Sequence, residues 1–166
     1  MPGQTSYSIL MACVLSAGFG LSARAAQPGT GFVVITSPDV TQQQLTRKSL
    51  ALIYRRRQNL WQDGSRIHPV NLPASDPLRI AFSRCVLGQS PEDTEDYWRQ
   101  MYFHGTLPPY VLASQQAVVL FVASTKGAVG YVAECPQDAA VKVLMVFGHP
   151  RKCHAPATAC VPLQDS

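Results

Sequence analysis

Two glycine-marked turns, each followed by a short apolar run, constrain the fold of this chain most. The first, Trp61–Val70, reads Trp-Gln-Asp-Gly-Ser-Arg-Ile-His-Pro-Val, and the second, Gly127–Val132, reads Gly-Ala-Val-Gly-Tyr-Val. Glycine turns that lead into β-branched residues are typical of the start of a strand. The residues between the two turns have helical patterns. The chain is therefore expected to combine strands and helices in one α/β structure.

The first part of the chain predicts a strand, a helix and a second strand. Phe32–Thr36 is a β-branched run typical of a buried strand. Thr41 and Gln44 have the spacing of a capping box, and apolar residues then recur at helical spacing to about Arg56. The second strand is expected over Arg66–Val70, where an internal proline favours a sheet edge or the end of the strand.

Two helices are predicted after the second strand. Ser75-Asp76 caps the first, and Pro77 occupies its first position, where a missing N–H costs nothing. The second opens with the acidic turn Ser90–Asp93 and ends at Gly105. Their buried faces are predicted to consist of Leu78, Ala81, Phe82, Cys85 and Val86 in the first helix, and of Tyr97, Trp98, Met101 and Tyr102 in the second.

The last predicted elements are one helix and two strands. After a loop at Pro108-Pro109, Ser114 caps a helix that runs through Val122. Strands are expected over Ala128–Ala133 and Val141–Phe147. This order of elements predicts a single α/β layer structure with a small mixed sheet.

The N-terminus has the properties of a signal peptide. Ile9–Leu21 is apolar and has the length of an h-region, too short to span a bilayer, and Ala23-Arg24-Ala25 supplies a cleavage pattern. Leu10–Cys13 is similar to a lipoprotein box but comes before an h-region is complete. No later run is long enough for a membrane span. We expect a periplasmic or secreted protein with three regions: signal peptide 1–25, folded domain 26–148 and an irregular, Cys-containing tail 149–166.

Four cysteines follow the predicted signal peptide: Cys85, Cys135, Cys153 and Cys160. In an oxidising compartment they predict two disulfides, for which three pairings exist. The favoured pairing joins Cys153 to Cys160 within the tail and Cys85 to Cys135 between a helix and a strand end, but the sequence does not decide among the three.

Charged residues indicate no nucleic-acid partner. Arg55-Arg56-Arg57, with Arg47 and Lys48, forms one basic cluster in a chain of formal net charge +4. The cluster fits a solvated helix end, where cations complement the helix dipole, and it also fits a surface for an anion or an anionic partner. Aromatic residues do not interleave with these cations, as they do in many nucleic-acid-binding proteins.

The two glycine-marked turns resemble the periplasmic phosphate-binding proteins of ABC importers, within the type 2 periplasmic-binding superfamily. Ile53-Tyr54, Trp61, Asp63-Gly64 and Ile67–Val70 match that family's helix end, turn and strand, and Gly127–Val132 matches its "GAIGYV" strand. The similarity spans about residues 32 to 146. It implies a single-lobe, periplasmic-binding-protein-like domain with a small mixed sheet flanked by helices.

The resemblance implies an anion site at Ser75, Asn71 and Arg79. In the family, helix N–H groups and an arginine hold phosphate. Here Ser75 matches a family serine, but Asn71 replaces the arginine. Arg79, one helical turn further on, is a candidate to compensate in part, and it fits a solvent-facing position equally well. Asp76-Pro77 stands where the family has Gly-Thr, which adds a carboxylate and removes a donor. The family aspartate is also replaced, by Pro73, and Arg56 replaces a family glycine at a helix end.

These residues lead to two hypotheses for function. The first is an exported, non-enzymatic solute-binding module that holds phosphate or another small anion weakly, since one lobe alone leaves a ligand half exposed. The alternative is a degenerate lobe that binds an envelope sensor or transporter protein, or a second copy of itself, for which an exposed aromatic patch would be the distinguishing feature. No enzymatic motif is present, and no cofactor or metal is expected, because His149, Cys153, His154 and Cys160 match no zinc spacing.

Overall fold

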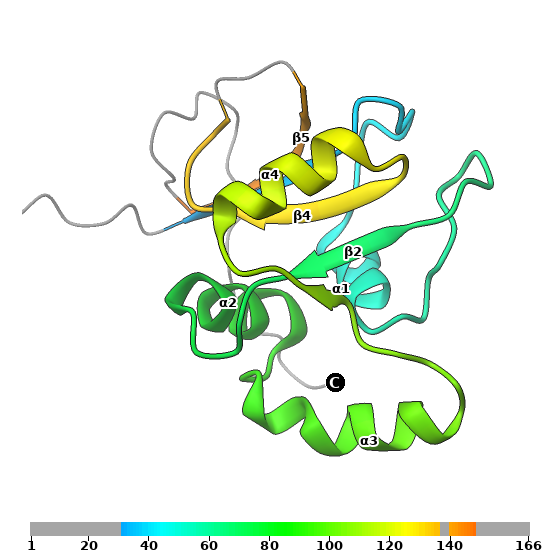
Figure 1. Ribbon diagram of the computed structural model, residues 1–166, viewed down its shortest axis with the longest axis vertical. Helices are drawn as coiled ribbons and strands as arrows, with labels where there is room; N and C mark the ends of the chain where they lie inside the picture. The colour runs from blue at the N-terminus through cyan, green and yellow to red at the C-terminus, as the bar shows by residue number, and fades with distance from the viewer. Residues whose placement is uncertain (1–30, 137–139, 149–166) are drawn as a thin grey trace, which may run out of the picture.

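The computed structural model describes residues 31–136 and 140–148. Its strands are β1 (Phe32–Thr36), β2 (His68–Asn71), β3 (Tyr110–Val111), β4 (Ala128–Val132) and β5 (Lys142–Phe147). They form one sheet in the order β3-β2-β4-β1-β5 (Figure 1). β1 is antiparallel to β4 and β5, whereas β2 is parallel to β3 and β4. The predicted mixed sheet flanked by helices is confirmed.

Helices cover both faces of the sheet. They are α1 (Arg47–Tyr54), α2 (Pro77–Phe82) with its π-helical extension η1 (Ser83–Leu87), the 3-10 turn η2 (Glu92–Thr94), α3 (Glu95–Phe103) and α4 (Gln115–Ser124). A Cβ placed on Gly130 of β4 would meet Val118 and Val122, so this side of β4 faces α4. Successive residues of a strand point to opposite faces. Tyr131 accordingly faces α1 and α2.

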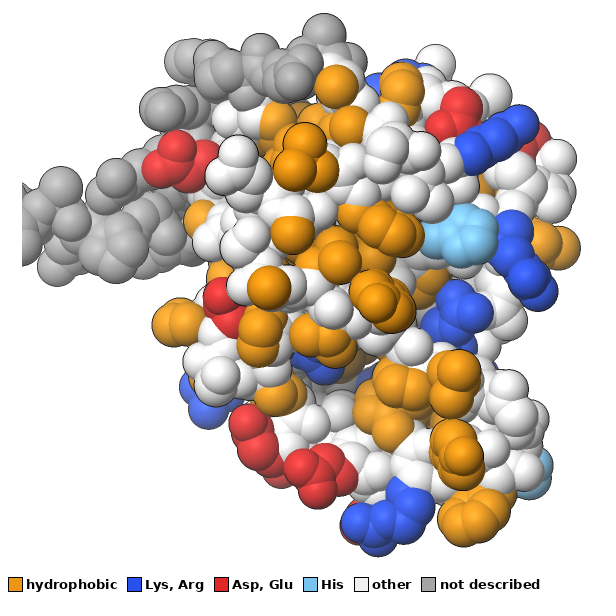
Figure 2. Space-filling view, in the orientation of Figure 1, with side chains coloured by type: hydrophobic (Ala, Val, Ile, Leu, Met, Phe, Trp, Pro, Cys, Tyr) orange, Lys and Arg blue, Asp and Glu red, His pale blue; other side chains and the backbone are white. Residues whose placement is uncertain are grey.

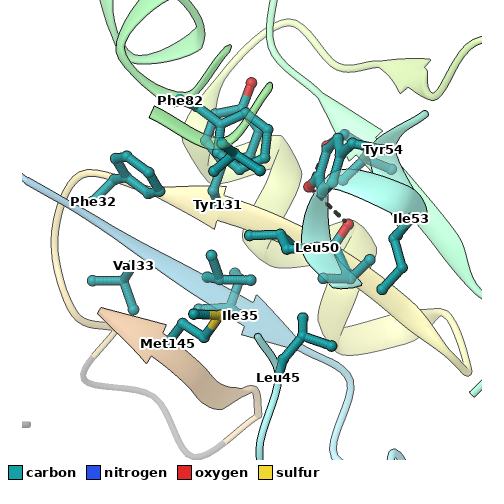
Figure 3. Packing of buried hydrophobic residues seen from close by; sticks show 14 of the residues in the cluster. Phe32, Val33, Ile35, Leu45, Leu50, Ile53, Tyr54, Phe82, Tyr131 and Met145 are labelled. Atoms are coloured by element: carbon teal, nitrogen blue, oxygen red, sulfur yellow. Dashed lines mark hydrogen bonds between the residues drawn. The ribbon is translucent and has the colours of Figure 1, made fainter. Parts of the chain in front are cut away.

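An aromatic cluster fills the core on the side of α1 and α2. The rings of Phe82 and Tyr131 stack with their centroids 3.9 Å apart, and Tyr54 lies 4.5 Å from Phe82. Phe32 of β1 contacts the same two stacked rings edge-on (Figure 3). All four side chains are almost completely buried. The cluster therefore joins β1, β4, α1 and α2 into one core.

The two glycine-marked turns that stand out in the sequence lie against each other. The indole Nε1 of Trp61 donates to the carbonyl of Gly127 at 3.0 Å, and the N–H of His68 donates to the same oxygen at 3.1 Å. Gly127 has a φ of +71°, and a Cβ there would overlap the carbonyl oxygen of Arg66. The pattern therefore serves the packing of β2 beside β4, because only glycine fits this close approach.

Two local expectations in the first half of the chain are corrected. Helix α1 begins at Arg47, and its cap is Thr46, whose hydroxyl accepts from the N–H of Ser49 at 3.0 Å. The predicted capping box at Thr41 and Gln44 is wrong, since the Thr41 hydroxyl donates to Asp63 instead. The start of the helix is therefore set by Thr46 and Ser49, and not by the earlier pair Thr41 and Gln44.

The two positions expected for Pro69, a sheet edge and the end of the strand, are both wrong, since Pro69 is the second residue of β2 (His68–Asn71). β2 lies between β3 and β4, so it is an interior strand. The N–H of His68 points to β4, and alternation then aims the nitrogen of Pro69 toward β3. β3 pairs only with Val70 and Asn71, so its pairing begins just past Pro69. The proline is tolerated because no donor is needed there.

The region of α3 departs most from the sequence prediction. No residue of α3 is buried: Tyr97, Trp98 and Met101 are half-buried, and Tyr102 is exposed. The expected loop at Pro108-Pro109 leads directly into β3, which the sequence did not reveal. Figure 1 shows α3 set apart from the sheet, below α2. The predicted side of this helix is therefore its less exposed side except at Tyr102, but it is not buried.

Several elements in the second half agree with expectation. Ser114 caps α4 through a hydrogen bond from the N–H of Ala117 at 3.2 Å. β4 and β5 match the two predicted strands to within one residue at each end. Among the described residues, no helix has both the length and the apolar character to cross a membrane.

Arg56 ends α1 in a strained conformation. It has a φ of +58° and is the one non-glycine residue with positive φ in the described part of the chain. The N–H of Arg56 donates to Ile53 at 2.9 Å and that of Arg57 donates to Leu52 at 2.8 Å, the hydrogen bonds of a Schellman motif. Glycine is the usual residue at this position.

We expect Arg56→Gly to raise the free energy of unfolding by about 0.5–1 kcal/mol, because glycine adopts positive φ without the steric cost that arginine bears. Urea denaturation of the oxidised protein measures the change. Arg57→Gly is the matched control, since Arg57 has no positive φ; it should leave stability unchanged or lower it. A loss of stability in Arg56→Gly equal to that in Arg57→Gly would contradict the explanation.

Candidate functional site

The start of α2, where the resemblance places an anion, is occupied by a carboxylate of the protein. Asp76 caps the helix: its Oδ1 accepts from the N–H of Leu78 at 2.8 Å and from that of Arg79 at 3.4 Å. Pro77 at the first helical position has no N–H to offer. The backbone donors that would hold an oxyanion therefore already hold Asp76.

Asn71 lies at the end of β2 and is 5% exposed. Its Oδ1 accepts from the hydroxyl of Tyr131 at 3.2 Å, and that hydroxyl accepts from the N–H of Leu72 at 3.4 Å. The side chain thus belongs to a buried hydrogen-bond network that links β2 to β4. This network is a structural role that the sequence did not reveal.

Arg79 is directed into the protein and is 8% exposed. Its Nε donates to the hydroxyl of Ser83 at 3.0 Å, and its Nη1 donates to the carbonyl of Leu72 at 3.3 Å. The expected inward face of α2 is partly wrong, because Ala81 is exposed while Arg79 and Ser83 are buried with Phe82. The buried face of α2 has ordinary helical spacing, but it includes the polar residues Arg79 and Ser83, so a pattern of apolar residues alone does not identify it.

The structure brings together two of the three predicted ligand residues. Asn71 and Arg79 both bond around the end of β2, close to Tyr131, whereas Ser75 is exposed in the turn before α2. The expected cap at Ser75-Asp76 is formed by Asp76 alone. The hydroxyl of Tyr131 is the additional polar group at this place, and the glycine-marked strand that contains it gave no signal of such a role.

Burial keeps the two tyrosines of this core neutral. It raises the pKa of Tyr131 to about 12, although the nearby Arg79 guanidinium acts in the opposite direction. Burial also raises the pKa of Tyr54 well above its usual value. Tyr54 donates to the carbonyl of Val70 at 3.1 Å. Both hydroxyls are therefore hydrogen-bond donors at neutral pH and contribute no negative charge.

We expect the protein to lose stability as the pH rises above 10, and Tyr131→Phe to lose less. An unfolded tyrosine ionises near pH 10, whereas folded Tyr131 keeps its proton to about pH 12. Between these values the unfolded state binds fewer protons, so the free energy of unfolding falls, by about 1 kcal/mol at pH 11 for this group. Urea titrations at pH 8 and pH 11 measure the difference. Tyr102→Phe, at an exposed tyrosine, should behave like wild type; equal losses in all three proteins would contradict the assignment.

The basic cluster at the end of α1 has a mixed role. Nη2 of Arg55 donates to the carbonyl of Leu87 at 2.8 Å, and the carbonyl of Arg55 accepts from the hydroxyl of Tyr97 at 2.7 Å. Arg57 is exposed and reaches the same hydroxyl at 3.5 Å. Burial, with the charge of Arg66 nearby, lowers the pKa of Arg56. Arg55 therefore holds α1 against η1 and α3, while Arg56 and Arg57 remain available to a partner.

Two grooves lie beside this cluster. One, of about 420 Å³, separates α1 and the end of η1 from the start of α3; its lining includes Leu52, Arg55, Tyr97 and Trp98. Figure 2 shows the molecule hollowed above α3. The other, of about 310 Å³, is lined by Arg56, His68, Pro69, Val70, Pro108, Pro109, Tyr110 and Phe121. We name this second one the proline groove.

The structure gives no metal site among residues 31–136 and 140–148, where no group of three potential ligands converges. The tail residues His149, Cys153, His154 and Cys160 lie outside the described residues. Cys85 and Cys135 are partly buried against the core. The pairing of the four cysteines stays a prediction.

Solved structures of phosphate-binding proteins share this fold. The crystal structure of an ABC-type phosphate transport receptor from Vibrio cholerae aligns with 69% of this chain and 45% of its own, at 18% identity and a TM-score of 0.55. A putative phosphate ABC transporter substrate-binding protein from Clostridium perfringens, solved with bound phosphate, aligns with 69% of this chain and 44% of its own, at 19% identity and a TM-score of 0.57. The sequence matches no family model and no curated protein.

The fold is therefore a solute-binding-protein fold of the phosphate ABC transporter type, as the resemblance predicts. The chain spans less than half the length of the two solved structures. At such low identity the similarity establishes the fold alone.

Proposed function

We propose that this protein is an exported, non-enzymatic module that binds a partner protein instead of trapping phosphate. The capping of α2 by Asp76 carries the proposal. This carboxylate accepts from the two N–H groups at the start of α2, where the resemblance in sequence implies an anion site. A phosphate bound there would have to displace the cap and lie beside a second negative charge. Near a protein surface, two such charges at close range repel by about 4 kcal/mol.

An exposed apolar surface supports a protein partner. It consists of Tyr102, Phe103, Leu107, Tyr110 and Val111, from the end of α3 to β3, and its most exposed side chain, Phe103, is 80% accessible. Figure 2 shows apolar side chains gathered over α3 and over the segment that follows it. Contiguous apolar residues on a soluble domain typically mark an interaction site. We call this set the apolar surface.

A second candidate function is weak binding of phosphate or another small anion by Asn71, Ser75 and Arg79. The observation in its favour is that Asn71 and Arg79 meet around the end of β2, at two of the positions where the resemblance in sequence implies a ligand. The hydrogen bonds of both side chains to the core count against it, because a ligand must compete with them.

Export belongs to the same proposal. Residues 1–25 act as a signal peptide, the domain at 26–148 works in the periplasm or outside the cell, and the tail 149–166 is held by a disulfide. Cys85–Cys135 and Cys153–Cys160 is the pairing we favour. A thiol titration of the denatured mature protein should find no free thiol, and four free thiols would contradict export into an oxidising compartment.

The proposed function is tested by a pull-down from envelope extract of the source organism, with the mature protein as bait. Phe103→Ser combined with Tyr102→Ser should abolish capture of a wild-type partner, because both side chains are exposed and contribute little to folding. Leu120→Ser, at an exposed residue of α4, is the matched control and should retain the partner. If wild-type protein captures nothing that the double variant loses, the proposed function is wrong.

A further inference from the structure

The proline groove combines a cation and a histidine with apolar walls and contains no acidic residue. It lies where β2 and the segment leading to β3 diverge, since β3 pairs only with Val70 and Asn71. Pro108, Pro109 and Tyr110 form one wall, and Tyr110 is 69% exposed. Arg56 and His68 supply the polar part of the lining. Such a groove suits an occupant that has both an apolar group and a negative charge.

Arg56 has the features of a residue retained for binding. Its positive φ costs stability that a glycine would not cost. Its side chain gains one long hydrogen bond, from Nη1 to the carbonyl of Ile67 at 3.5 Å. The charge of Arg66 acts on it unfavourably, and no carboxylate pairs with it among the described residues. Arg56 therefore has an unfavourable backbone conformation and is repelled by Arg66, and a bound carboxylate would offset these costs.

The groove is continuous with the apolar surface. Tyr110 belongs to both, and β3 ends the sheet, so its outer side has no neighbouring strand among the described residues. Figure 2 shows basic side chains and a histidine beside the apolar ones on this face. An extended chain that lies in the groove would therefore contact Arg56 and, at Tyr110, the edge of the apolar surface.

Building on the proposed function, we propose that the proline groove binds an extended segment of the partner protein in which a carboxylate side chain neighbours an apolar one. Arg56 receives the carboxylate, Arg66 adds to the positive field, and the imidazole of His68 offers a polar group in the lining. Tyr110 and the two prolines receive the apolar side chain. The charge argues against the chain's own tail as occupant, because residues 149–166 contain Arg151 and Lys152 and a single acidic side chain, Asp165.

The test begins with a random 12-residue peptide library displayed on phage and panned against the full-length mature protein. The enriched peptides are synthesised with a fluorescent label, and dissociation constants are measured by anisotropy at low and at physiological salt. We expect enrichment of Asp or Glu next to an aromatic or branched apolar residue, and weaker binding at higher salt. Enrichment without acidic residues would overturn the proposal.

Arg56→Gly provides the decisive comparison, because it should stabilise the fold while removing the cation. Binding of the enriched peptide should weaken at least tenfold in Arg56→Gly and in Tyr110→Ser. Arg99→Gln and Leu120→Ser remove a charge and an apolar group at exposed positions outside the groove, and should change affinity less than twofold. Binding that Arg56→Gly leaves within twofold of wild type would overturn the groove as the site.

The outcomes separate this proposal from the proposed function. Peptides that bind wild type and Arg56→Gly equally, but lose affinity when Tyr102 and Phe103 are replaced by serine, would leave the interaction function intact and refute the groove. A library that yields no binder would count against both. The remaining possible occupant of the groove is a second copy of this chain, which sedimentation of wild type and Arg56→Gly tests. A dimer that dissociates in Arg56→Gly would mean that a second copy, and not a partner segment, occupies the groove.

Discussion

Gly127→Ala should be among the most damaging single-atom additions to this protein, lowering the free energy of unfolding by about 3 kcal/mol or more. The new Cβ would overlap the backbone carbonyl of Arg66, and backbone cannot yield as a flexible side chain can. Relief of the overlap requires β2 and β4 to separate. That movement strains the hydrogen bonds from Trp61 and His68 to the carbonyl of Gly127. The positive φ adds a further cost of about 1 kcal/mol.

The control for this prediction is Gly64→Ala. Gly64 has a φ of +80°, similar to that of Gly127, but an added Cβ there meets nothing within 4 Å. It should therefore cost only about 1 kcal/mol, from the backbone conformation alone. Urea denaturation of both variants with disulfides intact gives the two values. Equal losses would show that the contact between the two glycine-marked turns does not constrain the fold.

Phe82→Ala should cost about 3–5 kcal/mol, the range for a fully buried phenylalanine. Phe82 has no exposed surface and contacts Phe32, Tyr54 and Tyr131. Figure 3 shows Phe82 packed among the rings of Phe32, Tyr54 and Tyr131, so its removal would leave a cavity where two helices and two strands meet. The loss should appear both as a lower urea midpoint and as faster unfolding.

Phe103→Ala makes the same chemical change at a side chain that is 80% exposed. It should alter stability by less than about 0.5 kcal/mol, as surface substitutions generally do. Because Phe103 belongs to the apolar surface, the same variant should weaken partner binding. A stability loss similar to that of Phe82→Ala would mean that α3 packs on the protein in solution and that the apolar surface does not exist.

The sequence predicted the parts of the fold whose signals are local. β1, α4 with its Ser114 cap, and the strand after Gly127 follow from residue types and turn chemistry within a few positions. The start of α2 at Pro77 follows in the same way. Such signals need no knowledge of distant residues, so tertiary packing had little reason to override them.

The errors arise where tertiary contacts decide. The aromatic residues of α3 suggested a buried face that includes Tyr102, yet Tyr102 is 64% exposed and no residue of α3 is buried. β3 is only two residues long, and its pairing with β2 depends on where the chain returns after α3. Pro69 is tolerated in an interior strand because β3 is only two residues long and does not pair with it. No local sequence pattern reveals the length of β3.

The candidate site was predicted in part. The residues Asn71 and Arg79 do come together, but as members of the core around Tyr131. The sequence indicated that the carboxylate of Asp76 is unfavourable for phosphate. In the structure this carboxylate accepts from the N–H groups at the start of α2, so a phosphate would have to compete with it for the same donors. The proline groove could not be foreseen, because its lining comes from α1, β2, α4 and the segment before β3.

A phosphate titration tests the central claim most directly. The melting temperature of the oxidised mature protein is followed with increasing phosphate, beside sulfate and chloride at matched ionic strength. Binding at a thousand times the dissociation constant would stabilise by about 4 kcal/mol, roughly ten degrees for a domain of this size. The account predicts equal curves for the three anions up to millimolar concentration, because Asp76 holds the donors of α2. A rise specific to phosphate, lost in Arg79→Ala, would contradict it and restore a solute-binding role.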